Sequence, residues 1–107
     1  MRRYGSMIGV KPERFEEYKR IHSMVWPEVL RTITKCNIRN YSIFYKDGLL
    51  FSYFEYIGDD FKKDMKKMAG NPVSQKWNNL CSLMQIPMET RKEGEWWAFM
   101  QEIFHYD

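Results

Sequence analysis

The chain has 107 residues, a formal net charge of +3, 44% hydrophobic residues and 17% aromatic residues. That length suits one domain covering 1–107, with a core that needs no metal or disulfide. The charge excess is too small to favour nucleic acid or an anionic membrane as partner, and no apolar run approaches the roughly 20 residues of a membrane span. Cys36 and Cys81 lack Cys-x-x-Cys spacing, so we expect reduced, buried thiols in a cytoplasmic protein.

The first part of the chain predicts a strand followed by two helical segments. The strand covers Arg3–Val10, and Pro12 suits the first position of a helix because its missing N–H does no harm there. Trp26-Pro27 breaks this helix, since a residue before proline is pushed out of the α region. Pro27 then starts a second helix, which is expected to end at Asn37.

A hairpin follows the second helix. Two alternating segments, Arg39–Lys46 and Leu49–Ile57, are joined by Asp47-Gly48, a strong two-residue turn signal. Both faces of this hairpin carry many apolar side chains, whereas a sheet with one wet face shows polar residues there. The second face is therefore also expected to be covered.

The last part of the chain predicts two more helices, a loop and a strand. One helix is capped by 58–60 and ends at Gly70, and the next begins at Asn71-Pro72. Residues 85–95 form the one long loop, whose length permits the role of a lid. Trp96–Tyr106 is expected to close the chain as a strand.

The predicted order is the ferredoxin-like βαββαβ pattern of the α+β class. Helices cover one face of the sheet, and the aromatic character of the other face predicts a homodimer whose two sheets form an α+β barrel. RNA-binding domains of the RRM type share this layout. The basic residue and the glycine–aromatic spacing of their third-strand motif are absent from 47–53, which disfavours RNA binding.

Few residues outside one stretch suggest chemistry. His22 and His105 are the only histidines, and neither has the spacing of a metal site. There is no glycine-rich phosphate loop and no Gly-x-Ser-x-Gly elbow. Glu55 is the only acid whose position suggests burial, and we expect it to pair with a lysine. His105 is expected to be an ordinary strand residue.

The candidate site centres on Tyr18 and His22, which lie four residues apart and share one face of the first helix. A lone histidine on an apolar stripe is more often a hydrogen-bonded core residue, and Trp77 fits the core of its helix as well as a pocket wall. Yet an indole covers the C–H face of a pyranose, and phenols and imidazole meet its hydroxyls. With Tyr41 and Trp97 as further walls, these residues make a plausible sugar site.

Several short segments in order along nearly the whole chain together resemble one known family. The most specific is the run Glu17-Tyr18-x-x-x-His22-x-x-x-Trp26-Pro27-Glu28. The others are Ile8–Val10, Asn40–Ile43, Leu49–Phe51, Gln75–Trp77 and Gln101–His105. The family is that of the L-rhamnose mutarotases. The resemblance implies a ferredoxin-like homodimer that interconverts the α and β anomers of L-rhamnose without a cofactor.

The resemblance also implies roles for individual residues. By position, His22 matches the family's proton donor, and Tyr18 and Tyr41 match its substrate-binding tyrosines. Trp77 matches the first of two adjacent tryptophans, while Asn78 stands where the second is expected. The exchange removes a stacking surface and adds an amide that can bind a sugar hydroxyl. Since related proteins of the family are associated with L-fucose, L-fucose or another 6-deoxyhexose is an alternative substrate.

Ring opening fits these residue types. It needs one proton delivered to the ring oxygen and one taken from the anomeric hydroxyl. A His22 imidazolium can supply the first, and a tyrosine, a water or the returning imidazole can take the second. The sequence leaves the charge state of His22 open, because the helix dipole favours the imidazolium while Lys19 and Arg20 oppose it. The alternatives are a cofactor-free monooxygenase of the same barrel architecture and a non-catalytic sugar-binding domain.

Overall fold

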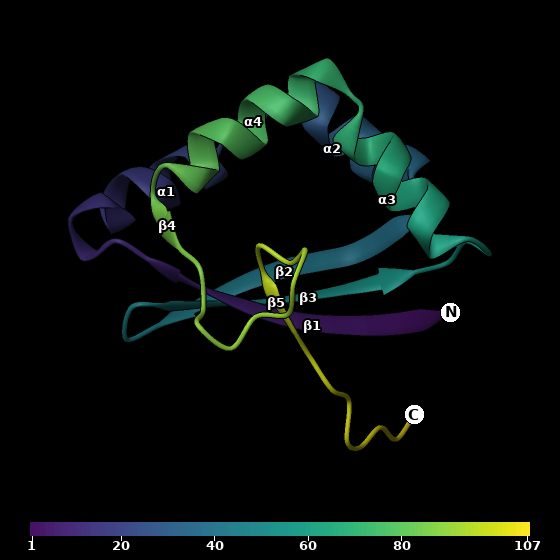
Figure 1. The fold of residues 1–107 in the computed structure, drawn as a ribbon. Helices are drawn as coiled ribbons and strands as arrows, with labels where there is room; N and C mark the ends of the chain where they lie inside the picture. Colours follow the sequence, from purple (N-terminus) through teal and green to yellow (C-terminus); the bar gives the residue numbers. More distant parts are fainter.

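A curled antiparallel sheet with helices on one face forms the molecule (Figure 1). A computed structural model describes residues 1–107. The strands, in the order β2-β3-β1-β4 with β5 also paired to β1, are β1 (Arg2–Val10), β2 (Ile38–Lys46), β3 (Leu49–Tyr56), β4 (Gln85–Ile86) and β5 (Ala98–Met100). The helices are the 3₁₀ turn η1 (Pro12–Arg14), α1 (Phe15–His22), α2 (Pro27–Lys35), α3 (Phe61–Ala69) and α4 (Pro72–Ser82). This confirms the ferredoxin-like order, and none of the helices has the length and apolarity needed to cross a membrane.

The helix ends follow local sequence signals. Trp26 is extended (φ −58°, ψ 131°) and Pro27 is the first residue of α2, as predicted. Asn37 takes a left-handed conformation (φ 67°) just beyond the end of α2. The side chains of Asp60 and Asn71 accept hydrogen bonds from backbone N–H groups in the first turns of α3 and α4.

The core lies between the helices and the sheet. Along β3 every second side chain is buried on the helix side, beginning with Leu50. The larger cluster of buried apolar side chains consists of Ile8, Val10, Tyr18, Val29, Leu50, Trp77, Cys81 and Met84. In a smaller cluster, Phe61, Met65 and Met68 of α3 pack on buried sheet residues.

A bulge in β2 decides which side chains of that strand face the helices. The hairpin turn has the two positive φ angles expected at 47–48. Farther along, Arg39 pairs with Glu55 but Ser42 pairs with Tyr53, so β2 carries one extra residue. Asn40, in the bulge, has φ 51°. The extra residue shifts which side chains of β2 face the helices, and Tyr41 therefore lies on the helix side. There the centroid of its ring is 5.5 Å from that of Phe54.

The last strand is much shorter than predicted. Only Ala98–Met100 pairs with β1, and residues 101–107 leave the sheet as a tail (Figure 1). Ile103 and Phe104 are 91% and 80% exposed. The alternating apolar pattern that predicted a strand reflects burial, and this chain offers those side chains no surface to pack against. His105 lies in the tail, where its Nε2 bonds to Asp107, and is not a strand residue.

The expected loop over 85–95 begins later than predicted. Gln85–Ile86 forms β4 by pairing with Gly9 and Val10 at the edge of the sheet. This pairing buries Gln85, which is 7% exposed. The sequence contained a polar residue there, and only the partner strand makes it part of the interior.

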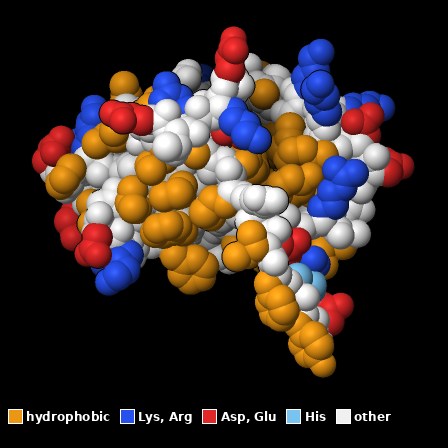
Figure 2. Space-filling view, turned by 60° about the horizontal axis from the view of Figure 1, so that its bottom comes forward, with side chains coloured by type: hydrophobic (Ala, Val, Ile, Leu, Met, Phe, Trp, Pro, Cys, Tyr) orange, Lys and Arg blue, Asp and Glu red, His pale blue; other side chains and the backbone are white.

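The helix-free face of the sheet is apolar at one end and polar at the other. Near the hairpin, Phe44 and Phe51 are directly paired, and Phe44 is 65% exposed. Figure 2 shows hydrophobic side chains gathered on this face of the molecule. At the other end Glu55 accepts hydrogen bonds from Tyr53 and Asn40. The expected lysine partner of Glu55 is therefore wrong, because its nearest donors come from its own strand and from the β2 bulge.

Candidate active site

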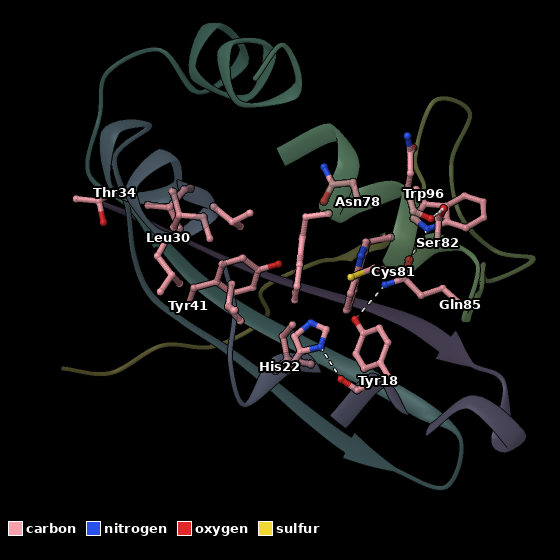
Figure 3. A pocket seen from close by; sticks show the side chains of 18 of the residues that line it. Tyr18, His22, Leu30, Thr34, Tyr41, Asn78, Cys81, Ser82, Gln85 and Trp96 are labelled. Atoms are coloured by element: carbon pink, nitrogen blue, oxygen red, sulfur yellow. Dashed lines mark hydrogen bonds between the residues drawn. The ribbon is translucent and has the colours of Figure 1, made fainter. Parts of the chain in front are cut away.

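A cavity of about 1020 Å³ opens between the sheet and helices α1, α2 and α4. Its walls include all five candidate site residues, which come from three different elements: Tyr18, His22, Tyr41, Trp77 and Asn78. Figure 3 shows the rings of the first three directed toward a common space. A cavity of this size is at the upper end of the range for small-molecule pockets, which are about 300–1,000 Å³.

The α1 helix presents Tyr18 and His22 together. Their rings stack with centroids 4.2 Å apart, and His22 is the last residue of the helix. The Nδ1 atom of His22 lies 2.7 Å from the Tyr18 carbonyl oxygen. Because a carbonyl can only accept, Nδ1 carries a proton. The other nitrogen, Nε2, is thereby left as the acceptor of the neutral ring, and this edge of the ring points into the cavity (Figure 3).

The surroundings of His22 favour its neutral form. Burial lowers the pKa of the imidazole, and the hydrogen bond to the Tyr18 backbone opposes this only in part. From the sequence, the helix dipole and the charges of Lys19 and Arg20 oppose each other and leave the charge of His22 open. In the structure, burial is the first cause of the shift in its pKa. The resting site therefore holds a base, Nε2, rather than an imidazolium.

Two phenols flank the imidazole and remain protonated. Burial raises the pKa of Tyr18 and raises that of Tyr41 to about 12. Tyr41 as a whole is 43% exposed, but it lines the cavity and its hydroxyl is directed into it (Figure 3). Both phenols can therefore donate hydrogen bonds at neutral pH.

Trp77 belongs both to the core and to the cavity wall, so both interpretations of this residue from the sequence hold. It is 7% exposed and meets the rings of His22 and Trp26 edge-on, with centroids 5.1 and 5.2 Å away. Asn78 follows on α4 and is exposed at the rim of the cavity. The amide is thus available to a bound molecule on the side where a second indole was expected.

Among the cavity residues that sequence reasoning missed are Gln85 and Trp96, which are joined by a hydrogen bond. The Trp96 indole Nε1–H donates to Gln85 Oε1 at 2.7 Å, and Gln85 Nε2 donates to the Tyr18 hydroxyl at 3.0 Å. Trp97 lines the cavity as well, and was named as a possible wall. The only signal for Gln85 was a polar residue between apolar neighbours, and its burial depends on pairing with β1.

The remaining groups of the cavity offer no ionised nucleophile. Cys81 lines the wall, and burial raises the pKa of its thiol to about 12. Both cysteines are free and buried, as predicted. No three His, Cys, Asp or Glu side chains lie together as a metal-binding group.

Comparison with known proteins relates this cavity to one enzyme family. A family model described as L-rhamnose mutarotase matches residues 3–106. The chain belongs to the L-rhamnose mutarotase family. It is 38% identical over 110 residues to the L-rhamnose mutarotase of Bacillus subtilis and 32% identical over 108 residues to that of Oceanobacillus iheyensis. Each alignment covers 100% of both chains. As a member of this family, the chain is an isomerase of the mutarotase type.

Solved structures support the fold. The L-rhamnose mutarotase of Formosa agariphila superposes with a TM-score of 0.78 at 19% identity, over 100% of both chains. Tetracenomycin F2 cyclase of Streptomyces glaucescens, a type-II polyketide cyclase, has a TM-score of 0.74 at 15% identity and is covered to 98%. The two names describe different chemistries, so the fold alone does not choose between them.

Proposed function

We propose that this mutarotase family member interconverts the α and β anomers of L-rhamnose, with His22 as the proton-transfer group. One observation carries the proposal. The tautomer of His22 is set by the Tyr18 carbonyl, which leaves Nε2 as a base facing an aromatic cavity. Sugar hydroxyls are suitable partners for such a base and for the two protonated phenols beside it.

The reaction needs only proton transfers. Nε2 accepts the proton of the anomeric hydroxyl while the bond between the anomeric carbon and the ring oxygen breaks and the aldehyde forms. The imidazolium then returns the proton to the ring oxygen, which is attached to the same carbon in the closed sugar. Rotation of the aldehyde and the reverse steps give the other anomer. Acid–base help of this kind contributes about 10²–10⁴-fold.

The phenols and the indole are proposed to hold the sugar. Tyr18 and Tyr41 donate to sugar oxygens, where negative charge develops as the ring opens. Trp77 covers a C–H face. On the α2 side the cavity is walled by Val29 and Ile33, an apolar surface that suits the methyl group of a 6-deoxy sugar. L-Fucose remains the alternative, because Asn78 at the rim can bind a hydroxyl of different orientation.

We further propose that the enzyme is a cytoplasmic homodimer joined through the helix-free sheet face. Exposed apolar side chains on that face support this: Phe44, 65% exposed, lies near the hairpin, and Met100, 43% exposed, lies on β5, where it pairs with Gly5. Monomers seldom leave contiguous apolar surface of this kind open to water. Two such sheets packed face to face would give the α+β barrel.

The chain's two histidines provide a direct test. His22→Ala should abolish anomer exchange of L-rhamnose, measured by saturation-transfer NMR, while the circular dichroism spectrum is retained. His105→Ala is the matched control and should keep full exchange, because His105 lies in the tail and bonds only Asp107. Full exchange in His22→Ala would refute the assignment. Sugar binding without exchange by the wild type would favour a binding domain, and oxygen uptake with a phenol would favour a monooxygenase.

The same measurement identifies the sugar. A panel of L-rhamnose, L-fucose and their common isomers compares exchange rates at equal protein concentration. We expect L-rhamnose to be fastest in the wild type. Asn78→Trp, which restores the expected second indole, should raise the preference for L-rhamnose over L-fucose.

A further inference from the structure

A buried amide lies beside the cavity. Gln85, at the start of β4, uses both ends of its side chain within the protein. Its oxygen accepts from the Trp96 indole at 2.7 Å, and its nitrogen donates to the Tyr18 hydroxyl at 3.0 Å. Figure 3 shows the three side chains in a row that ends at the cavity.

The indole decides which way round the amide lies. An indole N–H can only donate, so only the amide oxygen can face Trp96. The amide nitrogen, which can only donate, is then left for Tyr18, whose oxygen must accept. Turning the amide over would set two N–H groups against each other and leave a buried donor of Gln85 unpaired.

The proton of Tyr18 is consequently free for the cavity. A phenol has one proton, and no protein group accepts it in this structure, where the hydroxyl's one hydrogen bond is the one from Gln85. Burial raises the pKa of Tyr18, so the proton stays on the oxygen. A hydroxyl held in this way presents a donor to any ligand oxygen with a lone pair.

We propose that Gln85, oriented by Trp96, is a positioning residue that fixes the Tyr18 hydroxyl as a hydrogen-bond donor to the sugar in the cavity. The inference rests on the proposed mutarotase function. It makes the segment between β4 and β5 part of the site, because displacing Trp96 would free the amide to turn.

Gln85→Glu separates this role from simple packing. The ionised carboxylate has nearly the same shape but can only accept, so Tyr18 would turn its proton toward Glu and away from the sugar. The protonated acid can donate as the amide does. We therefore expect KM for L-rhamnose, relative to wild type at each pH, to rise about 3- to 10-fold when the acid is ionised and to recover as the pH falls. In Gln85→Met, the ratio of the variant's KM to the wild-type KM should be raised at every pH and show no inflection.

Dividing the KM of each variant by the wild-type KM at the same pH cancels the effect of groups that titrate in both proteins. Besides Tyr18, the groups of the cavity that carry or change charge are Arg39, His22, Tyr41 and Cys81, and these four are present in every variant. Chemical shifts of indole N–H protons report whether Trp96 still has its acceptor.

A double-mutant cycle locates the effect on Tyr18. In a Tyr18→Phe background the donor is gone, so Gln85→Met should change KM by less than about twofold. An equal effect of Gln85→Met in both backgrounds would overturn the inference, as would a Gln85→Glu ratio independent of pH. If Gln85→Met does not fold, the Gln85→Glu ratio decides alone. No exchange by wild type would refute the proposed function itself, and the inference with it.

Discussion

The pH dependence of anomer exchange tests whether His22 works from its neutral form. The perturbation is a fall in pH from about 8 to about 5, a range that spans ordinary histidine titration. Burial lowers the pKa of His22 below 6.5, and no charged partner restores it. Since Nε2 must be unprotonated to accept the anomeric proton, kcat/KM should fall toward low pH with its inflection below 6.5.

The magnitude follows from one titrating group. Below the pKa of His22, each fall of one pH unit lowers the fraction of neutral imidazole about tenfold, so kcat/KM should fall about tenfold per unit. Saturation-transfer NMR measures the rates, with exchange in the absence of protein subtracted at each pH. His105→Ala should give the same profile, because its side chain lies outside the cavity.

The same group should affect folding in the same pH window. The pKa of His22 is lower in the folded chain than in the unfolded chain, so the folded chain binds fewer protons between the two values. This contribution to stability is complete above the unfolded pKa and is lost as the pH falls through the folded pKa. His22→Gln should remove it, as measured by urea unfolding. An inflection in kcat/KM above 6.5, or a rate that rises as the pH falls, would refute a neutral base.

Two further predictions concern the strand that carries Tyr41 and the open sheet face. Asn40→Ala should destabilise the chain by about 1–2 kcal/mol in urea unfolding, because φ 51° is a left-handed conformation that Asn tolerates and Ala does not. It should also raise KM, because the bulge aims Tyr41 into the cavity. Asn40→Gly adopts the same φ without strain, so it should keep most of the stability; equal losses in both variants would contradict the backbone argument. Phe44→Lys, at a side chain 65% exposed, should shift the protein toward monomer in sedimentation equilibrium with little change in its circular dichroism. An unchanged mass would place the subunit interface elsewhere.

Long-range pairing accounts for the predictions that were wrong or missing. The strand expected at 96–106 ends at Met100, because alternation predicts burial but does not say what surface provides it. The sequence predicts a loop at Gln85, but pairing with β1 buries this residue. The sequence predicts a lysine partner for Glu55, but this carboxylate accepts a hydrogen bond from Asn40, which only the bulge in β2 brings within reach.

Local features of the sequence by themselves determined the helix that pairs Tyr18 with His22, the break at Trp26-Pro27 and the turn at 47–48. Each depends on the dihedral preferences and spacing of residues close together in the chain. Only the tertiary structure decided that Tyr41 joins them, since a bulge turns that side chain into the cavity. It also decided the charge state of His22 and the direction of the Tyr18 proton. Burial and a buried amide set these two properties, and both come from segments distant in the sequence.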